Sequence, residues 1–120
     1  MQLIAAVLVL AVAALHVYFL VLEMFLWTTR FGRRTFRTTP EFAESTRALA
    51  ANQGLYNGFL AAGLLWPLIA VGVHAGQTVI TFFLVCIVIA GVYGGVTVSR
   101  RIVLIQAVPA LVAGALVWLS

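Results

Sequence analysis

The sequence has no lysine, no aspartate and a single cysteine, and only 8% of its 120 residues are charged. One cysteine excludes an intrachain disulfide, and so little charge excludes a water-soluble chain of ordinary composition. His16, His74 and Cys86 lack the spacing of metal ligands, so neither a metal nor another cofactor is expected. Apolar residues make up 64% of the sequence, and the mean hydropathy is +1.16. This composition predicts an integral membrane protein.

Long apolar runs account for nearly the whole chain. A helix needs about 20 apolar residues to cross a hydrocarbon core of about 30 Å. Four runs reach that length, at residues 3–27, 48–73, 79–98 and 102–119. No basic residue precedes the first run, which favours a retained helix over a cleaved signal peptide. Residues 1–120 are therefore predicted to form one all-α domain, a four-helix transmembrane bundle with up-down-up-down topology.

All positive side chains are arginine, and they cluster at two of the three expected connections. The first cluster is Arg30, Arg33, Arg34, Arg37 and Arg47, and the second is Arg100 and Arg101. By the positive-inside rule, the first and third connections lie in the cytoplasm and both termini lie outside. Trp27 at the inner surface, with Trp66 and Trp118 at the outer surface, fits the aromatic belts of membrane proteins.

The same arginines suggest a partner. They carry no interleaved aromatic motif beyond Phe31 and Phe36, so nucleic acid is not expected. We expect the lipid bilayer and its anionic headgroups to be the partners, at about 1 kcal/mol for each basic group near the surface. A phosphate-bearing substrate is the other use of such a patch. The predicted headgroup residues are Arg30, Arg33, Arg34, Arg37, Arg100 and Arg101.

Two local patterns predict where the second helix begins and which helix faces pack closely. Thr39, Pro40 and Glu41 supply an N-cap, a first-turn proline and a first-turn acid, which predicts a helix from Pro40 to about Val73. Glycines four residues apart predict close helix contacts. These pairs are Gly54 with Gly58 and Gly91 with Gly95. Whether they meet within one chain or in a homo-oligomer is left open by the sequence.

Glu23 is the most informative polar residue because it lies inside the first apolar run. An acid at the bilayer centre costs at least roughly 2.5 kcal/mol, so such groups usually face other helices and mark a functional site. His16 lies seven positions earlier on nearly the same helix face, and Trp27 and Arg30 continue that stripe. One wall of the first helix is therefore predicted to be polar.

Counting depth at about 1.5 Å per residue predicts a polar pocket to which all four helices contribute. Its expected members are Glu23, His16, Trp27, Asn52, Gln53, Tyr56, Asn57, Tyr93 and Gln106. We expect Asn52 and Gln53 at the depth of Glu23, and Asn57 at the depth of His16. The alternative is that the amides only join helices, at about 0.6 kcal/mol for each bond, and that His16 is a neutral buried residue.

One segment resembles a known family. Residues 41–61, EFAESTRALAANQGLYNGFLA, together with Glu23, Met24 and Trp27 before them, resemble a bacterial integral-membrane family catalogued as domain of unknown function 1304. The resemblance covers the full chain and is closest in residues 51–61. It implies a small four-helix protein of the bacterial inner membrane, and it implies no activity.

Three functions follow from these observations. The first is binding or transport of a small or amphipathic molecule through a polar intramembrane pocket centred on Glu23. The second is an intramembrane enzyme in which Glu23 and His16 act as acid and base on a lipid or isoprenoid. The third is a membrane scaffold or partner subunit that uses the arginine patch and the glycine faces. Binding or transport is ranked first, because the sequence has no nucleophile or metal motif.

Overall fold

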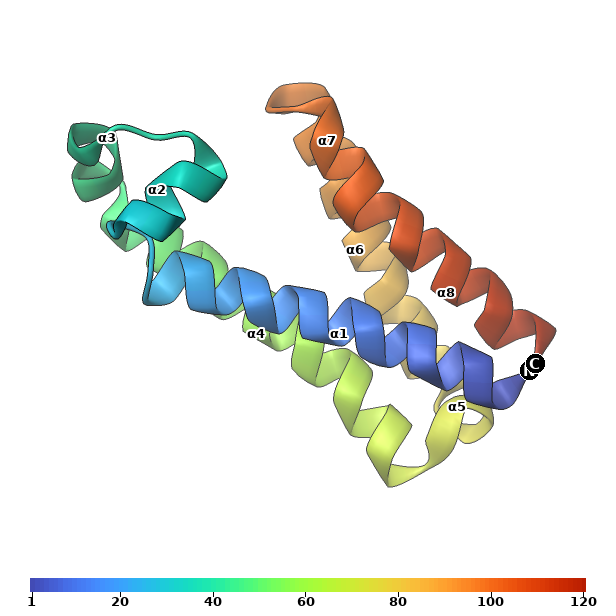
Figure 1. The fold of residues 1–120 in the computed structure, drawn as a ribbon. Coiled ribbons are helices and arrows are strands. Elements are labelled where there is room, and N and C mark those ends of the chain that lie inside the picture. Colours follow the sequence, from blue (N-terminus) through green and yellow to red (C-terminus); the bar gives the residue numbers. More distant parts are fainter. The chain divides into compact units, whose positions relative to one another are not determined.

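The computed structural model describes residues 1–120 and contains helices but no strands (Figure 1). The chain forms two compact units. Unit 1 comprises Met1–Ala14 and Leu60–Ser120, and unit 2 comprises Leu15–Phe59. Two long helices, α1 (Gln2–Met24) and α4 (Arg47–Ala70), each contribute one part to each unit. The predicted all-α fold is confirmed.

Unit 1 has an apolar core to which five helices contribute. Besides its parts of α1 and α4, it contains α5 (Gly72–Ala75), α6 (Gln77–Thr97), α7 (Arg100–Ile102) and α8 (Val108–Leu119). The buried cluster consists of Ala5, Val9, Val12, Ala13, Ala61, Leu64, Val73, Ile80, Leu84, Ile87, Ala110, Ala113 and Val117. Many of these side chains are alanine, which lets the helices approach closely.

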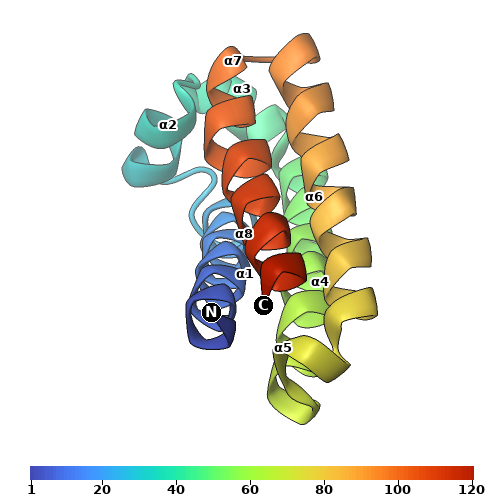
Figure 2. The ribbon, with the colours of Figure 1, turned by 90° about the vertical axis from the view of Figure 1, so that its right-hand side faces the viewer.

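The helices α6 and α8 lie side by side and run antiparallel in unit 1 (Figures 1 and 2). Glycine explains the close approach of α6 to residues Val103–Ala107, which immediately precede α8. A Cβ added at Gly91 would lie 2.7 Å from the backbone nitrogen of Ala107, and one added at Gly95 would collide with Val103. At the far end, the indole N–H of Trp118 donates to the hydroxyl of Thr81 at 2.9 Å. The last two predicted helices are therefore antiparallel neighbours within the chain.

A π-helical turn, η1 (Val103–Ala107), lies between α7 and α8. It was not predicted, because the sequence reads as one helix over residues 102–119. Pro109 supplies the reason: it has no N–H to donate to the carbonyl of Ile105. The backbone instead widens, and the N–H of Val108 bonds the carbonyl of Val103, five residues back.

Three helices are long and apolar enough to cross a membrane, namely Gln2–Met24, Gln77–Thr97 and Arg100–Leu119. They correspond to three of the four predicted spans and fit a membrane protein. The fourth predicted span corresponds to α4, which has 24 residues and so has sufficient length. Its composition sets it apart, because Asn52, Gln53 and Asn57 interrupt its apolar residues.

In unit 2, the segment between the first and second predicted spans differs from the prediction at both of its ends. The first helix ends at Met24, so Trp27 and Arg30 do not continue the stripe of His16 and Glu23. Its helical hydrogen-bond pattern ends where the N–H groups of Phe25 and Leu26 both donate to the carbonyl of Val21. An unpredicted helix, α2 (Arg30–Phe36), follows, capped by the hydroxyl of Thr29, which accepts from the Gly32 N–H at 3.2 Å.

The predicted helix from Pro40 to about Val73 is wrong in its continuity. It begins as expected, because the hydroxyl of Thr39 accepts from the N–H of Phe42 at 3.1 Å. It then divides into α3 (Pro40–Ser45), α4 and α5, with breaks at Thr46 and before Gly72. Gly72 has a φ of +87°, which a residue with a side chain rarely adopts.

Candidate functional site

The polar residues of unit 2 are positioned by the packing of α1 against α4. A Cβ added at Gly54 would lie 2.7 Å from Met24 Cγ and 3.1 Å from Glu23 Cβ, and one at Gly58 would lie 2.7 Å from Leu20. The two glycines therefore set the register by letting α1 lie directly on α4. This glycine pair meets its partner helix within one chain.

Glu23 and Asn57 form the central contact of the site. The side-chain N–H of Asn57 donates to Oε1 of Glu23 at 2.6 Å. Asn57 is only 6% exposed, whereas Glu23 is half-buried. No other hydrogen bond or ion pair reaches the Glu23 carboxylate, so its second oxygen has no donor from the protein. Because no buried side-chain oxygen lacks a partner, that second oxygen is accessible.

The position of Glu23 is unfavourable for an acid in a second way. It lies one residue before the end of α1, where the helix dipole is negative, and no basic residue is present in that last turn. An acid at a helix C-terminus costs typically 0.3 to 1 kcal/mol. Neither the partial burial nor the dipole therefore favours a carboxylate here, and the hydrogen bond from Asn57 is the compensation that the protein provides.

The pairing differs from the predicted depths by about one helical turn. Asn57 was expected beside His16 and instead bonds Glu23. Asn52 and Gln53, expected beside Glu23, are exposed, and Asn52 donates to the Tyr56 hydroxyl of its own helix at 3.3 Å. The depth count failed because it was anchored on Trp27, which lies beyond the end of α1.

His16 is fully buried, and its ring meets that of Phe19 edge-on at 5.4 Å. Seven residues separate it from Glu23, which corresponds to about 10.5 Å along the helix. The hydrogen bond to the Glu23 carboxylate comes from Asn57 and not from His16. Two further predicted members, Tyr93 and Gln106, belong to unit 1, in α6 and in the π-helical turn. Their place in a layer with Glu23 stays a prediction.

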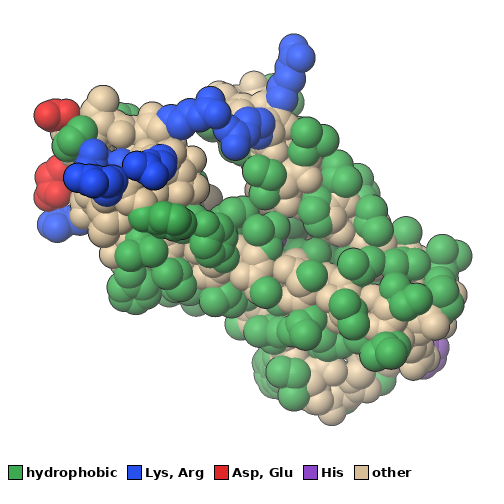
Figure 3. Space-filling view, in the orientation of Figure 1, with side chains coloured by type: hydrophobic (Ala, Val, Ile, Leu, Met, Phe, Trp, Pro, Cys, Tyr) green, Lys and Arg blue, Asp and Glu red, His purple; other side chains and the backbone are tan.

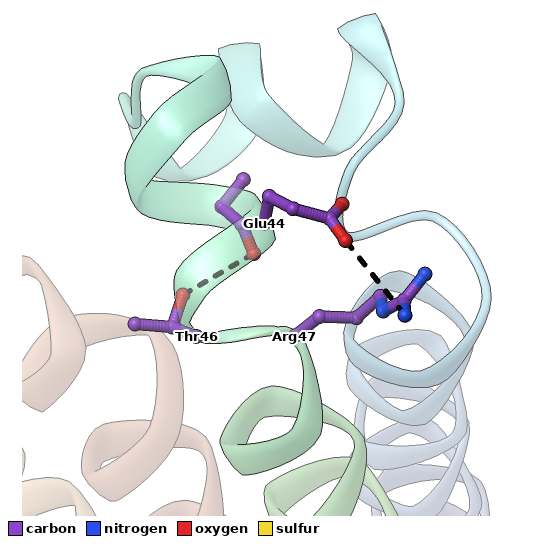
Figure 4. Close-up of polar contacts among 4 residues, drawn as sticks. Glu44, Thr46 and Arg47 are labelled. Carbon is purple, nitrogen blue, oxygen red and sulfur yellow. Dashed lines mark hydrogen bonds and ion pairs between the residues drawn. The ribbon is translucent and has the colours of Figure 1, made fainter.

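Trp27 links the short helices that lie between α1 and α4. Its indole N–H donates to the hydroxyl of Thr46 at 3.1 Å, and its ring lies 4.9 Å from that of Phe36. Thr46 in turn donates to the carbonyl of Phe42 at 2.7 Å, and next to it Arg47 forms an exposed ion pair with Glu44 at 3.7 Å (Figure 4). Trp27 thus joins α2 to the break between α3 and α4.

The arginines of the connection surround α2. Arg30, Arg34 and Arg37 are exposed and Arg33 is half-buried, with its Nε donating to the carbonyl of Thr28 at 3.3 Å. Arg37 ends the helix in the left-handed conformation, with φ of 57°. Arg100 and Arg101 belong to α7 of unit 1 and are exposed. The first arginine cluster is thus carried by a helix that the sequence did not predict.

Sequence reasoning missed two residues that shape the site. Gly32 is buried, and a Cβ there would collide with the carbonyl oxygen of Leu26, so only glycine lets α2 fold back against the end of α1. Thr46 receives the bond from Trp27. The cap residue Thr29 three positions before Gly32 was the available signal for α2.

Comparison with known proteins provides a family without an activity. Residues 10–118 match the family described as "Protein of unknown function (DUF1304)". The uncharacterized protein YpaA of Lactococcus lactis subsp. lactis (strain IL1403) is 30% identical over 115 residues, which cover 94% of this chain and 95% of YpaA. No solved structure matches the chain.

Proposed function

The chain belongs to the DUF1304 family, and we propose that it is a small integral membrane protein that binds or transports a small or amphipathic molecule at Glu23. The observation that carries this proposal is the half-buried carboxylate with one oxygen held by Asn57 and the other open. Acids in apolar helices are uncommon and usually serve a function. We therefore propose that the Glu23 carboxylate binds the ligand.

The proposed architecture is a four-helix transmembrane bundle with up-down-up-down topology, in which α4 is the fourth span. Both chain termini lie at the same end of unit 1, which also carries α5, whereas α7 lies at the other end (Figures 1 and 2). An even number of crossings places both termini on one side, so three spans alone do not fit. The core of unit 1, which includes α4, supports the same count.

We further propose the bacterial inner membrane as the location, with both termini outside. Arg100 and Arg101 lie in α7, and on the face shown in Figure 3 no arginine lies at the end with α5 and the termini. The positive-inside rule then places α7 in the cytoplasm. A cysteine at residue 2 in a Cys86→Ser protein should react with a membrane-impermeant maleimide added to intact spheroplasts.

The chemistry of Glu23 restricts the ligand. An ionised carboxylate accepts hydrogen bonds and attracts cations, and it donates nothing. The ligand should therefore present an N–H or O–H donor or a positive charge to the open oxygen. An amphipathic amine meets both this condition and the apolar surroundings of the end of α1.

Binding of dodecylammonium tests the proposal. The protein is placed in phosphatidylcholine nanodiscs and titrated by calorimetry, with empty nanodiscs as the blank. Binding to the wild type should weaken as the pH is lowered, because protonation removes the negative charge. Glu23→Gln should lose saturable binding and its pH dependence, and Glu41→Gln, which alters an exposed acid of the same unit, should retain both. Equal binding by all three proteins would contradict the proposal.

The intramembrane enzyme has less support, because His16 and Glu23 are about 10.5 Å apart along the helix. A product formed from a lipid extract only when both residues are present would favour it. A homo-oligomer through the glycine pairs stays a prediction. In this chain Gly54 and Gly58 contact α1, and Gly91 and Gly95 contact the π-helical turn η1, so self-association through them would have to replace these contacts.

A further inference from the structure

The helix α2 has two separate faces of different composition. At about 100° per residue, Arg30, Arg33 and Arg34 fall within an arc of about 100°. Gly32 and Phe36 fall within an arc of about 40°, whose centre is about 130° away from that of the arginines. This separation arises from the sequence RFGRRTF and needs no contact with the rest of the chain.

The Gly32–Phe36 face is held by the protein itself. Gly32 packs against the carbonyl of Leu26, and the ring of Phe36 lies 4.9 Å from that of Trp27. Trp27 is bonded to Thr46 in turn. Because these contacts fix the Gly32–Phe36 face, α2 cannot rotate its arginines inward. The arginine face is therefore directed away from Leu26 and Trp27.

The arginine face has no acidic partner. The side chains of Arg30 and Arg34 are exposed and form no hydrogen bond or ion pair, while that of Arg33 bonds one backbone carbonyl. The two acids of α3 do not neutralise them, since Glu44 pairs with Arg47 and Glu41 forms no ion pair. Figure 3 shows arginine side chains gathered over this part of unit 2. Arginine keeps its charge at any physiological pH and pairs well with phosphate oxygens.

We infer that the arginine face of α2 is a binding surface for the phosphate headgroups of anionic phospholipid. Its place in the chain selects a membrane surface over other polyanions. Arg30 follows the end of a candidate membrane span at Met24 by six residues, which span at most about 20 Å of chain. Headgroups lie at the ends of such spans. This surface is separate from the Glu23 site. Its arginines, which the positive-inside rule uses only to orient the chain, here also bind lipid.

Quenching of Trp27 by brominated lipids measures the preference. Trp66→Phe and Trp118→Phe leave Trp27 as the only tryptophan, next to α2. At low salt, brominated phosphatidylglycerol should bind more tightly near Trp27 than brominated phosphatidylcholine. In Arg30→Gln/Arg34→Gln the preference should fall, by about fivefold for each arginine removed. Neither arginine bonds the protein, so this variant should fold.

Arg30→Lys/Arg34→Lys is the matched control, because it keeps both charges. It should retain most of the preference, and added salt should reduce the preference in the wild type. Equal quenching by the two lipids in the wild type would overturn the inference. So would an unchanged preference in the glutamine variant, or a lysine variant that loses as much as the glutamine variant. A duplex oligonucleotide that binds the protein in phosphatidylcholine nanodiscs, without a lipid preference, would assign the face to another polyanion.

Discussion

Unit 1 buries an apolar cluster and contains only Arg100 and Arg101 as charged residues, whereas unit 2 contains all three glutamates and the remaining arginines. The residues that unit 2 buries include His16 and Asn57. Both units contain a hydrogen bond from an indole N–H to a threonine hydroxyl, since Trp118 donates to Thr81 in unit 1 and Trp27 donates to Thr46 in unit 2. The two units thus differ in the charged and polar residues that they contain, and this contrast is the reason why we place the proposed ligand site in unit 2.

The largest expected effect compares one glycine from each unit. Gly32→Ala should lower the free energy of unfolding by about 3 kcal/mol, at the upper end of overpacking effects, because the new Cβ collides with the Leu26 carbonyl. Gly114→Ala should be neutral or stabilise by up to about 1 kcal/mol, since its Cβ meets Leu84 at an ordinary 3.8 Å. Thermal unfolding in detergent, followed by circular dichroism, measures both. Equal effects would show that the fold of α2 does not depend on Gly32.

A smaller effect is expected at the Glu23 contact. Asn57→Ala should destabilise by about 1 to 3 kcal/mol, because it leaves a half-buried carboxylate oxygen without a donor. Asn52→Ala, which removes an exposed bond within α4, should cost less than about 0.5 kcal/mol. Chemical unfolding in the same detergent measures the pair. If the Asn57 variant is as stable as the Asn52 variant, the Glu23 contact contributes nothing to unit 2.

The two tryptophan bonds provide a third comparison. Thr46→Val should destabilise by about 1 to 2 kcal/mol, because it removes the acceptor for Trp27 and also a bond to the Phe42 carbonyl. Thr81→Val removes a single bond at the exposed end of α8 and should cost about 0.5 to 1 kcal/mol. The shift in melting temperature measures both. A larger shift for Thr81→Val would reverse the proposed order.

The smallest effect is expected at the ion pair of α3 and α4. Arg47→Gln removes the exposed contact with Glu44 at 3.7 Å, and it should change stability by less than about 0.5 kcal/mol. That small effect should vanish at high salt, because exposed charges are screened. Melting curves at low and high salt measure it. A salt-independent loss above 1 kcal/mol would indicate that Arg47 has a second partner.

The apolar unit was predictable from the sequence and the connection was not. Length and hydropathy placed α1, α6 and the continuous helical stretch Arg100–Leu119 to within a few residues, because an apolar run has few alternatives in a membrane. The helix α2 was missed, since its stability comes from contacts of Gly32 and Phe36 with residues that lie outside it. Short helices depend on such tertiary contacts more than on local propensity.

Within the site, Glu23 was identified correctly as a residue that needs a partner, and its partner was misassigned. The depth count treated Trp27 as part of the first helix, although that helix ends at Met24. The better signal was the spacing of Gly54 and Gly58, which sets where α1 crosses α4. Glycine contacts fix a register between two helices, whereas a count from an assumed helix end does not.

The proposed role of the Glu23 carboxylate is to hold a ligand, and mass spectrometry of the molecules that copurify with the protein tests this role. Wild type, Glu23→Gln and Glu41→Gln are prepared from the same membranes in the same detergent. We expect a molecule with an amine or hydroxyl donor to copurify with the wild type and with Glu41→Gln, and to be lost from Glu23→Gln. The same bound molecules at the same occupancy in all three preparations would contradict this role.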